Sequence, residues 1–309
     1  MLSQVGSNWR KFVLALSMAT FFYSAHAADM KPEDLVAKNL DSIGTAQVRA
    51  ANKSQVLQGT SRFKVLVGGG GVLEGSAGIV SEERKSTLVL KFSDNQYHGE
   101  QMVCDGDKFY IANTTASHRR SILGEFVWSQ SLILREGLLG GELSTAWTLD
   151  NLDVNKPQLS YGGLKKFDGK QVHDLRYRSK KGTDMDIHIY FDAETFQHVA
   201  TVYKITLPAG LGGASPSATD QVGLSSQANN PSGGVSDPTA SAHQQETRYT
   251  LEERFSDFKT ADGMTLPSHY EIHFTQELQD GRTTLYEWDA TFNQVSHNVT
   301  LDPRNFQVK

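Results

Sequence analysis

The first part of the chain with a clear hydrophobic pattern is typical of a short amphipathic helix. Pro32 suits a first helical turn, apolar residues then recur at helical spacing, and Gly44 ends the run after Ile43. We therefore predict a helix over residues 32–43. Because an isolated helix of this length is marginal in water, its apolar face needs a sheet or another helix to cover it.

From Ser54 onward the apolar positions alternate with polar ones, which is the period of a half-buried strand. Turn-forming Gly, Asp and Asn residues separate the alternating runs. We therefore predict an antiparallel meander with one buried face and one wet face. The predicted strands are 54–67, 72–81, 86–92, 100–104, 108–113, 158–166, 169–178, 184–192, 197–206, 247–258, 266–278 and 282–296.

Residues 119–149 interrupt the strand pattern. Apolar residues recur here at mostly helical spacing, and Gly137, Gly140 and Gly141 break the runs, so we predict one or two short helices. This segment carries more apolar surface than a connection needs. Two interpretations are open: it is a lid over a cavity, or it is ordinary core.

Residues 207–245 differ in composition from the rest of the chain. Gly, Ser, Ala, Pro, Asn and Thr dominate, with almost no aromatic or charged residues. Such a segment buries too little apolar surface to offset the entropy lost on ordering. Strand patterns flank it directly, so we predict a disordered insertion within one domain that spans residues 28–309.

Residues 1–27 have the pattern of an export signal. Two basic residues precede an apolar run over 12–23, and residues 25–27 match the small-x-small cleavage site. As a helix the apolar run spans roughly 18 Å, short of the ~30 Å core of a membrane. We therefore predict cleavage after Ala27 and, because the cleavage region has no cysteine for a lipid anchor, a soluble periplasmic protein.

Composition and charge narrow the classes of function. With 38% hydrophobic and 21% charged residues, the 309-residue chain is globular in character. Its single cysteine, Cys104, excludes an internal disulfide or a thiolate zinc cluster. Two of the 30 Lys and Arg and none of the 35 Asp and Glu lie in the signal, so the remainder carries a net charge of −7. Nucleic acid, which needs a cationic face, is not an expected partner.

No catalytic set stands out among the polar residues. The chain has neither the GxSxG elbow nor a nucleotide-binding glycine motif. His269 and His273 alternate with apolar residues, so both lie on the polar face of a strand. Asp184, Asp186 and His188 could gather a divalent ion, but alternating polar residues are normal on a solvated strand face. We predict no enzyme activity, no metal site and no cofactor.

Several local patterns follow one another across residues 31–309. They are the helix 32–43 ending in Gly44, Glu74-Gly75-Ser76-Ala77-Gly78, Asp105-Gly106-Asp107-Lys108-Phe109-Tyr110, Phe191-Asp192-Ala193-Glu194-Thr195, and Ser256-Asp257-Phe258 with Asp262-Gly263-Met264-Thr265-Leu266-Pro267. Each is a simple turn signature. In this order they resemble the LolA/LolB-like family of periplasmic proteins that sort outer-membrane lipoproteins.

The resemblance implies a mainly β (α+β) fold: a curved, antiparallel, unclosed β-barrel with an N-terminal helix and a short helical lid. Its concave apolar face would accept acyl chains. The family has an Arg-Pro step after the glycine-marked strand, whereas here Arg84 is followed by Lys85, so Arg84 is a loose equivalent. The residues expected to cover a bound chain are Leu123, Phe126, Val127, Ile133 and Trp147.

The leading functional hypothesis is a non-enzymatic, monomeric periplasmic carrier. It binds lipid or the acyl chains of lipoproteins, shuttles them between envelope membranes and contacts membrane proteins transiently. The alternative is a periplasmic module that uses the same fold to bind or sense a protein without lipid cargo. A hydrolase whose site assembles only in the fold is a third, weaker hypothesis.

Overall fold

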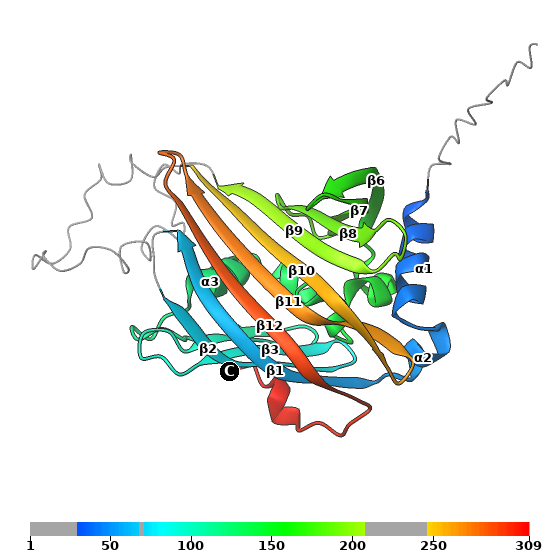
Figure 1. Cartoon of the computed structure of the whole chain (residues 1–309), viewed down its shortest axis with the longest axis horizontal. Coiled ribbons are helices and arrows are strands. Elements are labelled where there is room, and N and C mark those ends of the chain that lie inside the picture. The colour runs from blue at the N-terminus through cyan, green and yellow to red at the C-terminus, as the bar shows by residue number, and fades with distance from the viewer. Residues whose placement is uncertain (1–29, 68–70, 208–245, 309) are drawn as a thin grey trace, which may run out of the picture.

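Twelve antiparallel strands form one strongly curved sheet (Figure 1). The structure is a computed structural model that describes residues 30–67, 71–207 and 246–308. The strand order is β5-β4-β3-β2-β1-β12-β11-β10-β9-β8-β7-β6, so in this part of the chain β5 and β6 are the two edges of an unclosed sheet. The strands are β1 (Ser54–Val67), β2 (Val72–Glu82), β3 (Lys85–Phe92), β4 (Gly99–Cys104), β5 (Phe109–Ile111), β6 (Gln158–Phe167), β7 (Lys170–Arg178), β8 (Asp186–Asp192), β9 (His198–Leu207), β10 (Thr247–Ala261), β11 (Met264–Leu278) and β12 (Thr283–His297).

The first and last strands of the chain meet in the middle of the sheet. β1 pairs with β12 from Gln55 opposite His297 to Val67 opposite Leu285, and on its other side it pairs with β2. The sheet therefore consists of two meanders, β1–β5 and β6–β12, that lie side by side. This central pairing joins residues that are far apart in sequence, so it depends on both meanders having formed.

The central strands have one apolar face and one polar face. In β11 the side chains of Tyr270, Ile272 and Phe274 are buried, whereas those of His269 and His273 are on the opposite side and partly exposed. This is the period-two alternation that the sequence predicts. We call the buried side the inner face of the sheet and the other side its outer face.

Two helices at the N-terminus pack at one end of the sheet (Figure 1). α1 (Pro32–Ile43) has the predicted bounds and contacts β6 and β11. Its buried Asn39 donates a hydrogen bond to the carbonyl of Phe196, 3.1 Å away in the β8–β9 turn. α2 (Ala46–Ala51) is a further short helix that the sequence pattern did not predict.

The predicted fold class is confirmed by the unclosed antiparallel sheet of 12 strands with few helices. The predicted strands match the observed ones closely. β10 continues to Ala261 rather than ending at Phe258, because its pairing with β11 persists as far as Ala261 opposite Met264 after the apolar alternation has ended. A short C-terminal helix, η5 (Pro303–Phe306), was not predicted.

Some sequence predictions fall on parts of the chain that are not described. The signal 1–27 lies outside the described residues, and so does the insertion 207–245 except for Leu207, which ends β9. Within the described residues, no helix combines the length and apolar character that a membrane crossing requires.

Candidate functional site

One helical segment connects the two edges of the sheet and covers its inner face. The chain leaves β5 at one edge and enters β6 at the other, and we call residues 121–155 between them the helical plug. In Figure 1 this green segment lies behind β10, β11 and β12. The plug comprises α3 (Ile122–Ser129), α4 (Leu132–Arg135), η1 (Gly141–Leu143), η2 (Thr148–Asn151) and α5 (Leu152–Asn155).

Local sequence explains why the plug is helical but broken. Ser121 caps α3, its hydroxyl accepting a hydrogen bond of 2.8 Å from the backbone N–H of Gly124. Gly141 adopts a positive φ of 50°, and a Cβ at this position would lie 2.7 Å from the ring of His198. Glycine therefore lets the backbone of the plug approach the sheet closely.

The five residues predicted to cover a ligand all lie inside the plug, and none is more than 6% exposed. Phe126 packs against Tyr249 and Phe274 of the inner face, with ring centroids 5.7 and 5.1 Å apart. Trp147 stacks on His198 at 4.9 Å. The structure thus brings Leu123, Phe126, Val127, Ile133 and Trp147 together in one core with the sheet. Their contact with a ligand remains a prediction.

The cavities show how tightly the plug is packed. A cavity between Ile79, Met102 and Leu139 has a volume of about 10 Å³, which is room for one water. A larger cavity of about 420 Å³ lies beside α2, but Glu142, Asp150 and other polar residues line much of it. Where the plug covers the inner face, its own apolar side chains fill the space.

Arg84 lies apart from this core. It is in the β2–β3 turn, half-buried, with its Cβ against the glycine of the β4–β5 turn, Gly106. The five cover residues are inside the plug, whereas Arg84 is at an end of two strands. Its equivalence to the arginine of the resembled family remains a prediction.

A buried carboxylate, Glu253 of β10, joins the plug to the sheet. It accepts hydrogen bonds from the hydroxyls of Tyr203 and Tyr270, at 2.6 and 2.5 Å, and from the backbone N–H of Gly140, at 2.6 Å. The side chain is fully buried, and loss of hydration raises its pKa to about 7. One acid thus connects β9, β10 and β11 with the plug.

Glu136 makes a second polar connection, between the plug and the end of β7 in the sheet. Its carboxylate accepts hydrogen bonds of 2.6 Å from the hydroxyls of Tyr177 and Ser179, at the end of β7. Glu136 is 3% exposed, so all three groups are removed from water. Because each buried polar group needs its partner, moving the plug outward would cost these bonds unless water or a ligand replaced them.

Glu142 is another buried acid of the plug, and Asn39 contributes a side-chain hydrogen bond that acts against the rise in its pKa. Its Oε2 has no hydrogen-bond partner among the described residues, and the side chain borders the cavity beside α2. Burial raises its pKa to about 8, and the nearby charge of Asp150 acts in the same direction. Glu142 is therefore protonated and neutral over most of the neutral pH range.

We expect Glu142→Gln to flatten the pH dependence of stability. The folded protein keeps this proton up to about pH 8 and the unfolded chain loses it near 4.5, so the folded state binds more protons between these values and stability falls as pH rises. The wild type should lose about 2 kcal/mol more than the variant between pH 6 and 8. Urea unfolding at both pH values measures this.

The matched control is Asp153→Asn, which neutralises an exposed acid of the same plug. Its pH dependence should follow that of the wild type. A Glu142→Gln variant with the slope of the wild type would show that Glu142 is ionised in the folded protein.

The sequence pattern does not predict the buried acids, although it contains one signal of them. Alternation places Glu253 on the same strand face as Leu251 and Phe255, which are apolar and buried. A charged residue in an apolar row indicates a buried polar partner set. Nothing local marks Glu136 or Glu142, because their burial depends on how the plug meets the sheet.

Of the three polar residues considered for a divalent ion, Asp184, Asp186 and His188, the structure brings Asp186 and His188 into contact. His188 lies between Asp174 and Asp186, with its Nδ1 2.6 Å and its Nε2 3.1 Å from their carboxylates. Asp174 comes from β7 and is fully buried. Lys165 Nζ also lies 2.5 Å from Asp174, which neutralises its charge. This group is an ion-pair cluster, and Asp184 precedes the strand.

The fold and the plug define a class of protein: an unclosed antiparallel sheet whose apolar inner face is covered by the chain's own helical segment. No family model matches the sequence, and no curated protein matches it.

Similar solved structures include three of interest. A DUF1329 family protein from Desulfovibrio piger is 14% identical, with a TM-score of 0.44 over 90% of this chain and 98% of that one. A putative outer membrane lipoprotein-sorting protein domain from Vibrio parahaemolyticus is 9% identical, with a TM-score of 0.37 over 88% and 97%. The MucA/MucB complex of Pseudomonas aeruginosa includes a chain that is 11% identical, with a TM-score of 0.21 over 86% and 100%.

Proposed function

We propose that the inner face and the plug bind a lipid or the acyl chains of a lipoprotein, and that the protein is a non-enzymatic periplasmic carrier between envelope membranes. One observation carries the proposal: a broad apolar sheet face is covered by a short, broken helical segment rather than by a second sheet. The predicted export signal and the resemblance of the sequence to lipoprotein-sorting proteins agree with this role.

The plug is built in a way that suits movement. Its covalent connections are the segment after Ile111 and the short link from Asn155 to Gln158, at opposite edges of the sheet. Its longest helix, α3, spans only Ile122–Ser129, so the plug is a set of short pieces. Such a segment can leave the inner face without disturbing the strand pairing of the sheet.

The free energy of burying an acyl chain can replace that of burying the plug's own apolar side chains. Hiding a fourteen-carbon chain from water is worth roughly 10 kcal/mol, at about 0.8 kcal/mol per methylene. In the closed structure Phe126 and Leu123 fill that apolar space themselves. A bound chain would replace their contacts with the inner face, so the exchange leaves no apolar surface of the sheet exposed.

A disulfide that ties the plug to the sheet tests this role. The backbone nitrogen of Thr145 lies 3.0 Å from Oγ of Ser81 in β2, so the plug and the sheet are in contact at these two positions. We expect Ser81→Cys with Thr145→Cys, in a Cys104→Ser background, to lose at least tenfold in affinity for a fluorescent fatty acid when oxidised. Reduction of the same protein should restore uptake.

The reduced protein and the two single-cysteine variants serve as controls, because they carry the substitutions without the cross-link. Intact mass confirms that the disulfide has formed. Full uptake by the cross-linked protein would contradict movement of the plug, and absence of saturable uptake by the delipidated wild type would contradict lipid binding itself.

A second candidate function is a protein-binding module in which the plug is fixed core. The cavity of about 420 Å³ favours it, because Asn52, Glu142 and Trp147 line that cavity and each has a buried polar atom without a hydrogen-bond partner among the described residues. Such groups suit the amides of a peptide. Native mass spectrometry of protein purified without detergent separates the two: added lipid masses support the carrier, and a clean unliganded mass favours the module.

A further inference from the structure

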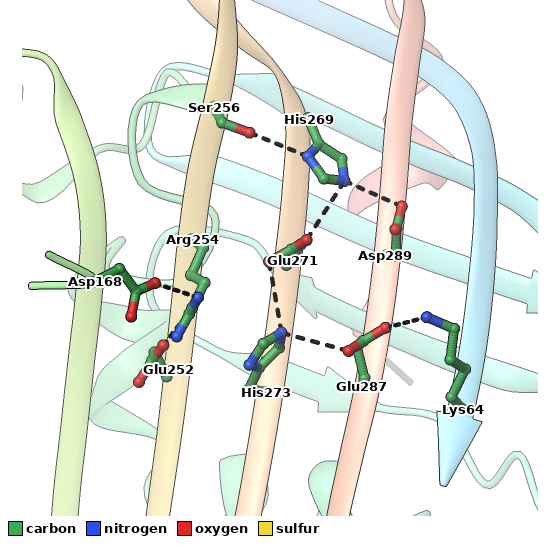
Figure 2. A network of polar contacts seen from close by, with 10 residues as sticks. All are labelled: Lys64, Asp168, Glu252, Arg254, Ser256, His269, Glu271, His273, Glu287 and Asp289. Atoms are coloured by element: carbon green, nitrogen blue, oxygen red, sulfur yellow. Dashed lines mark hydrogen bonds and ion pairs between the residues drawn. The ribbon is translucent and has the colours of Figure 1, made fainter. Parts of the chain in front are cut away.

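The outer face of the sheet carries a cluster of polar groups that the proposed function does not use. Two histidines and three carboxylates lie on adjacent strands, β11 and β12, with Ser256 and Arg254 beside them on β10 (Figure 2). Strand pairing places Glu271 directly opposite Asp289. The cluster consists of His269, Glu271, His273, Glu287 and Asp289.

Three of these side chains converge on one point. Nε2 of His269 lies 3.2 Å from Oδ1 of Asp289 and 3.7 Å from Oε1 of Glu271. All three atoms lie within 4.8 Å of one another. A tetrahedral zinc ion with ligands at 2.0–2.1 Å holds neighbouring ligand atoms about 3.3 Å apart. The two distances from His269 are close to this value.

The neighbouring residues orient these groups. Nδ1 of His269 lies 3.0 Å from the hydroxyl of Ser256. When Nδ1–H donates to that oxygen, Nε2 keeps its lone pair, which is the tautomer that a metal ligand needs. The second oxygen of Glu271 lies 3.5 Å from Nε2 of His273, so Oε1 remains directed at His269.

Basic residues of the protein offset part of the negative charge of the cluster. Lys64 lies 2.6 Å from Glu287 and offsets that carboxylate. Arg254 is opposite Glu271 on β10, but it pairs with Glu252 and Asp168. Glu271 and Asp289 are a cross-strand pair of like charges beside two histidines, and a cation between the two carboxylates would relieve their repulsion. Their combined charge of −2 matches a divalent ion.

We propose that His269, Glu271 and Asp289 bind one zinc-class divalent ion on the outer face of the sheet. The three side chains are 23%, 27% and 23% exposed, so the ion can enter from solvent. Water or an added ligand completes the fourth position. The ion joins β11 to β12 and lies on the opposite side of the sheet from the plug, so the site does not depend on the proposed carrier function.

The experiment measures zinc binding by the tag-free, metal-stripped full chain, using calorimetry and metal analysis after dialysis. We expect one zinc per chain, loss of at least tenfold in affinity in His269→Ala and in Asp289→Asn, and about tenfold weaker binding in Ser256→Ala, because outer partners of zinc ligands typically contribute 10–100-fold. Cobalt(II) in place of zinc should give the visible absorption of a tetrahedral site.

The matched control is His188→Ala, which removes the histidine that lies between Asp174 and Asp186. It should bind zinc as the wild type does, because Asp174 there is already neutralised by Lys165. Circular dichroism of each variant confirms folding. Zinc binding that is absent in the wild type, unchanged by His269→Ala, or reduced equally by His188→Ala would overturn the proposal.

Discussion

Replacing Glu253 with alanine is expected to lower the free energy of unfolding by about 3–5 kcal/mol, because it leaves three buried hydrogen-bond donors unpaired. The substitution leaves the hydroxyls of Tyr203 and Tyr270 and the N–H of Gly140 without their acceptor. Each buried donor left unpaired costs about 1–3 kcal/mol. Urea unfolding followed by far-UV circular dichroism measures the change.

The neighbouring residue provides the control. Glu252 is on the outer face and pairs with Arg254, so Glu252→Ala should cost no more than about 1 kcal/mol. The difference between the losses of unfolding free energy in the two variants measures the effect of burial on the inner face. Similar losses in both variants would contradict the role assigned to Glu253.

Replacing Trp147 with alanine is expected to cost about 3–5 kcal/mol as well, for a different reason. The indole is 1% exposed and stacks on His198. Its removal leaves a large cavity between the plug and the sheet, which the surrounding side chains fill only in part. Circular dichroism is the suitable probe of unfolding, because the substitution changes the intrinsic fluorescence.

Trp128 of the same plug is the matched control. It is 40% exposed and packs on the guanidinium of Arg120, with a distance of 4.6 Å to the ring. Trp128→Ala should therefore cost only about 0.5–1 kcal/mol, the worth of an exposed cation–π contact. A small loss in Trp147→Ala would show that the plug is loosely held even without a ligand.

Much of the fold could be predicted because strands and helices have local signatures. The alternation around Ile187 and Ile189 and the helical run that ends at Ile43 depend on residues close in sequence, so their positions were predicted closely. α2 was missed because it is short and has no buried residue. A helix of this kind leaves no apolar stripe in the sequence.

The candidate sites were predicted less completely. The five apolar residues of the plug were identified from their pattern, but the pattern could not distinguish a lid from core, and the structure shows them packed as core. His269 was placed correctly on a polar strand face. Its approach to Asp289 was not foreseen, because it requires the register in which β11 pairs with β12.

Local patterns along the chain specify most of the helices and strands, the face that each strand buries and the mainly β class, because these follow from side-chain periods over a few residues. Only the tertiary structure decided the pairing of β1 with β12, the burial of Glu253 beneath Gly140 and the meeting of His269 with Asp289. Each of these joins residues from separate elements. Such contacts depend on the register and curvature of the whole sheet, which no local pattern encodes.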